Sequence, residues 1–99
     1  MRDARIEYAI KDRLGLNLVR CRRRAGLSQE ELSALASLHR TEISHLERGL
    51  RIARADTLVK LAGGLSMPVG DLFEGLAWEP GSFRPGGFRL AESEPRKPR

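Results

Sequence analysis

Apolar side chains between residues 4 and 25 recur at steps of three or four, which is the spacing of one face of an amphipathic helix. They are Ile6, Ile10, Leu14, Leu18, Cys21 and Ala25. Gly15 is a position at which this helix can break or kink. Gly26 predicts the end of the helix, because glycine adopts the left-handed conformation of a helix terminus without steric cost.

Two short helices separated by a tight turn are predicted next. Ser28 and Glu31 have the spacing of a capping box, in which a hydroxyl and a carboxylate satisfy backbone N–H groups of the first helical turn. The second helix begins near Arg40, behind the less usual cap His39, and ends at a glycine. Two helices joined so tightly, the second ending in glycine, are typical of a helix-turn-helix.

A fourth amphipathic helix is predicted to start near Ala55. Its apolar face consists of Leu58, Leu61, Ala62 and Leu65. A fifth, very short helix after Pro68 carries Val69, Leu72 and Phe73. From Glu79 onward the composition shifts to Pro, Gly, Arg and Glu, and residues 92–99 are expected to be disordered.

Length and composition limit the domain count, the location and the partners that we expect. The 99 residues suffice for one compact domain. Neither a membrane span nor a signal-peptide core is expected, so the protein is predicted to stay in the cytoplasm. Eighteen Lys and Arg against thirteen Asp and Glu give a net charge of +5, which favours a polyanion such as double-stranded DNA as partner. The single cysteine, Cys21, is interpreted as a small buried hydrophobe.

The sequence lacks the parts that an enzyme needs. It has no Gly-rich phosphate loop, no set of metal ligands and no nucleophile with a nearby base. We therefore expect no enzymatic activity, no cofactor and no metal.

Several sequence motifs follow one another between Leu14 and Gly75. They are Leu18 and Arg22, GLSQEEL at 26–32, IS-x-LERG at 43–49, and the TLVKLAGGLSMPVGDLF run that follows. In these motifs the chain resembles the lambda-repressor/Cro-like family, also called the xenobiotic-response-element family. The resemblance implies an all-α fold. Its parts would be a compact five-helix DNA-binding domain over residues 14–75, an N-terminal helical extension over 1–13, and an irregular, partly disordered tail over 76–99.

Within this family, HRTEIS at 39–44 and LF at 72–73 are similar to the controller proteins of restriction-modification systems. The chain also departs from the family pattern. Ser37 stands where glycine is common, and a left-handed conformation there would cost about 1 kcal/mol. Arg54 stands where a capping serine is usual.

The second helix of the motif has a polar edge opposite its apolar side. The edge consists of Arg40, Thr41, Ser44, His45 and Arg48. An α-helix fits the major groove, whose base edges present donors and acceptors that such side chains can read. The resemblance assigns base contacts to Arg40, Thr41, Ser44 and His45, with the Arg40 guanidinium on guanine. A plain solvated helix face, and phosphate pairing by Arg40, are the alternatives.

Groups around this helix are candidate phosphate contacts. They are Arg24, Ser28, Gln29, Arg48, Arg51 and Arg54. The resemblance implies that Gln29 anchors a phosphate at the start of its helix. Free backbone N–H groups at that helix end also attract an anion. An ordinary solvated surface is the alternative. The resemblance also pairs Arg22 with Glu47 in a partly buried structural ion pair between the first and third helices.

One short reading helix contacts too few bases for selectivity, so the resemblance implies a homodimer. Candidate interface residues, each of which can equally belong to the core, are Leu65, Val69, Leu72, Phe73 and Trp78. The apolar residues of the tail can cover the core, form a strand between subunits or bind a partner protein. The sequence therefore predicts a sequence-specific transcription regulator that acts on a two-fold symmetric operator. The alternative is an antitoxin that binds a toxin through its tail and autoregulates with the same motif.

Overall fold

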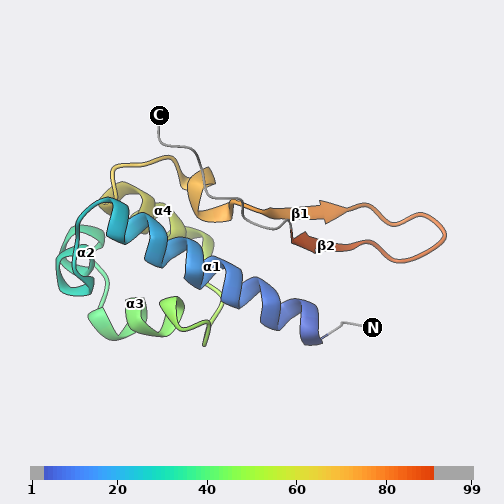
Figure 1. Cartoon of the computed structure of the whole chain (residues 1–99), viewed down its shortest axis with the longest axis horizontal. Helices are drawn as coiled ribbons and strands as arrows, with labels where there is room; N and C mark the ends of the chain where they lie inside the picture. Colours follow the sequence, from blue (N-terminus) through green and yellow to red (C-terminus); the bar gives the residue numbers. More distant parts are fainter. Residues whose placement is uncertain (1–3, 91–99) are drawn as a thin grey trace.

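The computed structural model describes residues 4–90 and the side chains of residues 10–90 (Figure 1). Its elements are α1 (Ala4–Arg24), α2 (Gln29–Ala36), α3 (Arg40–Glu47), α4 (Ala55–Gly64), the 3-10 helix η1 (Val69–Phe73), β1 (Leu76–Glu79) and β2 (Gly87–Leu90). The predicted apolar role of Ile6 and the predicted disorder of residues 92–99 lie outside this description. Every described helix is too short or too polar to cross a membrane.

The helix α1 is uninterrupted, so the break considered at Gly15 does not occur. Gly15 is buried where α1 crosses α3, and a Cβ atom there would lie 2.8 Å from the carbonyl oxygen of Glu47. It would also collide with the carbonyl oxygen of Leu46. The missing side chain therefore allows two helices to pack closely. The predicted end of the helix is confirmed by Gly26, which has a φ of 72°.

The caps of α2 and α3 agree with the sequence. The Ser28 hydroxyl accepts from the N–H of Glu31 at 3.0 Å, and the Glu31 carboxylate accepts from the N–H of Ser28 at 2.9 Å, which confirms the capping box. The His39 Nδ1 atom accepts from the N–H of Thr41 at 3.1 Å, so the unusual cap is confirmed as well. Between the helices Ser37 adopts the left-handed conformation with a φ of 54°.

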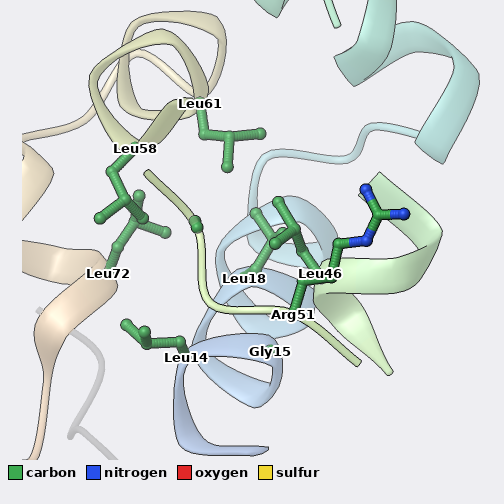
Figure 2. A pocket seen from close by; sticks show the side chains of 9 residues that line it. Leu14, Gly15, Leu18, Leu46, Arg51, Leu58, Leu61 and Leu72 are labelled. Atoms are coloured by element: carbon green, nitrogen blue, oxygen red, sulfur yellow. The ribbon is translucent and has the colours of Figure 1, made fainter. Parts of the chain in front are cut away.

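Leucines from all five helical elements fill the interior of the helical body, and Figure 2 shows those of α1, α3, α4 and η1. They include Leu18 of α1, Leu46 of α3, Leu61 of α4 and Leu72 of η1, none of which is more than 5% exposed. The space left among them is about 10 Å³, which is no more than a single water needs. This space therefore has no room for a ligand.

The C-terminal part differs from the prediction. Four α-helices are described, and the expected fifth helix is the 3-10 turn η1, so the five-helix count is not confirmed. The tail is not irregular up to Leu90, because β1 and β2 form an antiparallel hairpin in which Trp78 pairs with Phe88. Their rings meet edge to face with centroids 5.1 Å apart. Four-residue strands are too short for a clear period of two, which explains why the sequence did not predict them.

The hairpin is anchored at its base. The buried Asn17 of α1 donates through Nδ2 to the carbonyl oxygens of Leu72 at 2.9 Å and Glu74 at 3.0 Å. These two hydrogen bonds hold the end of η1, from which β1 departs. Beyond that point the hairpin extends away from the helical body, along the longest axis of the molecule (Figure 1).

Candidate nucleic-acid interface

The helix α3 has one buried side and one outward side. Ile43 is fully buried and Leu46 is 5% exposed, so these two side chains fix the rotation of the helix against the core. The candidate base-reading residues lie on the other side: Arg40 and Thr41 are exposed, and Ser44 and His45 are partly exposed. The packing therefore presents a row of hydrogen-bonding groups to the solvent.

An ion pair holds the C-terminal end of α3 to α1. The guanidinium of Arg22 donates to both carboxylate oxygens of Glu47, from Nε at 2.6 Å and from Nη2 at 3.0 Å. The two side chains are 14% and 5% exposed, respectively. The hydrogen bond to Glu47, with its negative charge, raises the pKa of Arg22. Arg22 also donates to the carbonyl oxygen of Leu27 at 2.9 Å, which adds the loop before α2 to the same network.

Gln29, at the start of α2, extends this network to the outward side of α3. Its Nε2 atom donates to Glu47 at 2.9 Å, and its Oε1 atom accepts from Arg40 Nη1 at 3.5 Å. The amide orientation is fixed by the carboxylate, because only the nitrogen of the amide can donate. Gln29 therefore connects the buried ion pair to Arg40, a connection that the sequence analysis did not identify.

The candidate phosphate contacts come from the end of α1, the start of α2, the end of α3 and the loop before α4. Those classed as exposed are Arg24, Ser28, Arg48, Arg51 and Arg54, whereas Gln29 is partly buried. Figure 2 shows the guanidinium of Arg51 directed away from the leucine core. Arg54 lies 3.3 Å from Asp56, but both side chains are largely exposed, so this ion pair contributes little.

The N-terminus of α2 already holds an acidic side chain. The backbone N–H of Ser28, and then its hydroxyl group, lower the pKa of Glu31 by hydrogen bonding to the carboxylate. A phosphate that approaches this helix end therefore meets a carboxylate as well as backbone N–H groups. The arginines are therefore expected to supply more of the attraction for phosphate, and the start of α2 less, than the sequence alone indicates.

The five candidate dimer residues divide into two groups. Leu65 and Leu72 are 5% and 1% exposed within a single chain, so they belong to the core and cannot reach a partner. Val69, Phe73 and Trp78 are exposed by 39%, 40% and 57%. Only the exposed three therefore stay candidates for the interface. In η1 the side chain of Leu72 packs inward, whereas those of Val69 and Phe73 stay partly outside.

Among the described residues, no group of three or more His, Cys, Asp or Glu side chains is arranged to hold a metal ion. The geometry offers hydrogen-bond donors, acceptors and positive charge on one convex helix instead. Such a surface suits recognition of a polyanion that presents base edges in a groove as wide as a helix.

Comparisons with known proteins agree with this reading. A model of the helix-turn-helix family (HTH_3) matches residues 18–72. The restriction-modification controller protein C.AhdI from Aeromonas hydrophila has 35% identity and a TM-score of 0.64, over 66% of this chain and 98% of that chain. The controller protein C.Esp1396I has 28% identity and a TM-score of 0.61, over 66% of this chain and 86% of its own. The clp gene regulator ClgR from C. glutamicum has 25% identity and a TM-score of 0.61, over 64% and 82%. No curated protein sequence matches.

Proposed function

The chain belongs to the lambda-repressor-like helix-turn-helix family of DNA-binding transcription regulators, and we propose that it acts as a homodimer on a two-fold symmetric operator. In this proposal α3 enters the major groove of each half-site. The observation that carries it is the two-sided packing of α3, which buries Ile43 and Leu46 and leaves the polar edge outside. A convex helix with that edge matches the width and the hydrogen-bonding groups of the major groove.

Arg40 is the proposed principal base reader. It stands at the first position of α3, where a helix laid in the groove brings its N-terminal residues to the base edges. Its guanidinium can donate to N7 and O6 of guanine together, which discriminates against other bases by about 1–3 kcal/mol. Gln29 lies beside it, with its Oε1 atom 3.5 Å from Arg40 Nη1. Thr41, Ser44 and His45 are proposed to contact neighbouring bases.

The exposed arginines, together with Ser28 and Gln29, are proposed to contact the phosphates on both sides of the groove. Each neutralised phosphate releases condensed counterions, so these contacts set the affinity and its salt dependence but not the sequence preference. The homodimer follows from the size of the reading element. A helix of eight residues reads few base pairs, and two copies on one face of the DNA supply the missing selectivity.

Selection of binding sites from random DNA, at a stated salt concentration, tests the proposal. We expect the wild-type protein to select a two-fold symmetric site. Arg40→Ala should relax the preference at one position of each half-site, with a loss of discrimination of about tenfold or more. Arg48→Ala is the matched control, because it removes an exposed arginine from the opposite end of the same helix and should weaken binding to all sequences alike.

Two results would contradict the proposal. An unchanged site preference for Arg40→Ala would remove Arg40 as a base reader. A wild-type protein that selects no symmetric site would exclude the dimeric regulator altogether. The likeness to C.AhdI, which extends over 98% of that chain, favours a controller of restriction-modification genes over an antitoxin. An endonuclease or methyltransferase reading frame beside the gene would support this choice, and a toxin reading frame would overturn it.

A further inference from the structure

An apolar groove of about 450 Å³ lies between the helical body and the base of the hairpin. Its walls come from α1, the loop after α3, η1 and both strands, and include Ile10, Leu14, Ile52, Phe73, Trp78 and Phe88. Ile10 and Leu14 precede the residues that the family model matches, and the hairpin follows them. The groove is therefore built largely from parts of the chain that lie outside the common DNA-binding domain.

The rim of this groove exposes four large apolar side chains. Ile52, Trp78 and Phe88 are 49%, 57% and 47% exposed, and Phe73 is 40% exposed. Aromatic side chains present about 150–250 Å² each, so the three aromatic residues alone leave about 300 Å² uncovered. Continuous apolar patches of this size mark interaction surfaces, and they supply a substantial part of the roughly 800 Å² per partner of a stable interface.

A second exposed apolar group stands at the far end of the hairpin. Phe83, in the loop between β1 and β2, is fully exposed, with a relative accessibility of 104%. Among the described residues no side chain covers it, so its phenyl ring lacks the stabilisation that burial brings. A large hydrophobe held out on a projecting hairpin is a group that fits into a pocket of another molecule.

We propose that the groove is the docking site for a second copy of this chain, and that Phe83 of each protomer occupies the groove of its partner. The proposal rests on the homodimer of the proposed function and identifies the surface through which it forms. It also explains the exposure of Val69, Phe73 and Trp78, because Phe73 and Trp78 line the groove and Val69 lies on the same 3-10 helix.

Two-fold symmetry makes this exchange geometrically simple. When two hairpins lie side by side and antiparallel, the tip of each comes to the base of the other, and the groove is at the base. The seven residue steps from Leu76 to Phe83 span at most about 23 Å at 3.3 Å per step, and this sets the offset between the tip and the base of the hairpin. The groove volume falls in the range of about 300–1,000 Å³ that holds compact apolar ligands, so a phenyl ring fits.

The chain's own C-terminal residues are a poor alternative occupant. Residues 91–99 have the sequence AESEPRKPR, which contains five charged residues and two prolines but no large apolar side chain. Burying charged groups against an apolar wall is costly unless they are paired. A second copy supplies what the groove lacks, because each protomer carries both the groove and the exposed phenyl ring.

Trp78 provides a direct readout of the exchange. It is the single tryptophan of the chain and lines the groove, so its emission reports the polarity of the groove. In the protein without DNA, we expect emission to shift to shorter wavelength as concentration rises, in step with the formation of dimers measured by sedimentation. Phe83→Ala should abolish the shift and raise the dimer dissociation constant at least about 100-fold, since symmetry removes two buried rings at once.

Mixing two variants separates direct docking from indirect effects. Phe83→Ala keeps an intact groove but has no ring to insert. Ile52→Glu keeps the ring but places a charge in the groove wall, at a side chain already half exposed, so the fold should tolerate it. Each variant alone should be monomeric, whereas an equimolar mixture should form a heterodimer with one intact contact and a partial emission shift. Leu35→Ala, at a 59% exposed leucine of α2 away from the groove, is the control and should dimerise like wild type.

Several outcomes would overturn the proposal. A wild-type dimer that Phe83→Ala leaves unchanged would place the interface elsewhere while the proposed regulator function stands. A mixture of the two variants that stays monomeric would show that docking of Phe83 in the groove does not hold the dimer together. A monomer at every concentration, combined with selection of a symmetric operator, would also reject the groove as the dimer surface. Loss of specific DNA binding with normal dimerisation would instead reject the proposed function alone.

Discussion

The helical body and the hairpin of this protein use their apolar residues in opposite ways. The core cluster begins at Leu18 and ends at Leu72, and these are also the first and last residues that the family model matches. In the hairpin, by contrast, Trp78, Phe83 and Phe88 are all at least 47% exposed. The family domain therefore encloses a contiguous apolar core, although it also exposes Leu35, Leu50, Ile52, Val59 and Val69. None of the hairpin residues 76–90 is buried. We infer that the body supplies stability and the DNA-reading surface, and that the hairpin supplies contact with another molecule.

Two glycines at close backbone approaches, one in each region, allow this difference to be tested. Gly15 lies where α1 crosses α3, and Gly86 lies where the hairpin loop folds back on β1. At both sites an added Cβ atom would collide with a backbone oxygen. The chemical change from glycine to alanine is the same, so any difference in outcome reports the region and not the substitution.

The largest effect is expected for Gly15→Ala. The new methyl group would collide with the carbonyl oxygens of Leu46 and Glu47, and backbone atoms of two packed helices cannot move aside independently. We expect the free energy of unfolding to fall by about 3 kcal/mol, at the upper end of overpacking effects. Urea denaturation followed by circular dichroism measures it.

The matched control is Gly63→Ala, also within a helix, where an added Cβ would meet nothing within 4 Å. This variant should be slightly more stable than wild type, by about 0.5–1 kcal/mol, because alanine restricts the unfolded chain. If the two variants had equal stability, the close crossing of α1 and α3 would not be a determinant of the fold.

A smaller loss is expected for Glu47→Ala, which removes one member of the ion pair between α1 and α3. Arg22 would keep a mostly buried charge whose carboxylate partner is gone, and Gln29 would lose its acceptor. We expect a loss of about 2 kcal/mol, below the largest values for broken buried pairs because Arg22 is not completely enclosed. Specific DNA binding should weaken as well, since Gln29 no longer holds its orientation beside Arg40.

Glu42→Ala is the control for this prediction, because it removes another glutamate of α3, one that lies in the first turn of the helix. Its effect should stay within about 0.5 kcal/mol, as for other surface changes. Equal losses for Glu42→Ala and Glu47→Ala would indicate that helix charge, and not the pair with Arg22, accounts for the stability.

The sequence was sufficient for the helical body because its signals are local and agree with one another. The capping box of Ser28 and Glu31, the unusual cap at His39 and the glycine after α1 each specify a boundary within a few residues. The outward edge of α3 followed from the position of Ile43 and Leu46 by helical periodicity alone.

What the sequence left undetermined depends on contacts between distant segments. Gly15 was interpreted as a possible break, because its real partner, the end of α3, lies about thirty residues away. The link from Glu47 through Gln29 to Arg40 is likewise a contact between two elements, α2 and α3. Leu65 and Leu72 could belong to the interface or to the core on the sequence alone, and they lie in the core. A helical pattern identifies an apolar face without identifying what covers it. The base contacts, phosphate contacts and homodimer stay predictions.

The smallest effect on the body is expected for Gly86→Ala. A Cβ atom there would lie 2.5 Å from the carbonyl oxygen of Glu79 and 2.7 Å from Cζ2 of Trp78, so the hairpin should open. The core does not include these residues, so the helical unfolding transition should change by less than about 0.5 kcal/mol. Emission from Trp78 should nevertheless shift toward that of a solvated indole at low denaturant, separately from the helical signal.

Gly87→Ala is the control for this variant, because an added Cβ at the adjacent glycine would meet nothing within 4 Å. It should leave both the Trp78 emission and the helical transition as in wild type. If Gly86→Ala instead lowered the helical transition as much as Gly15→Ala, the hairpin and the body would unfold as one cooperative unit. The division between a self-sufficient helical domain and a separately folding hairpin would then be wrong. If that division holds, the hairpin can unfold locally while the helical domain stays folded.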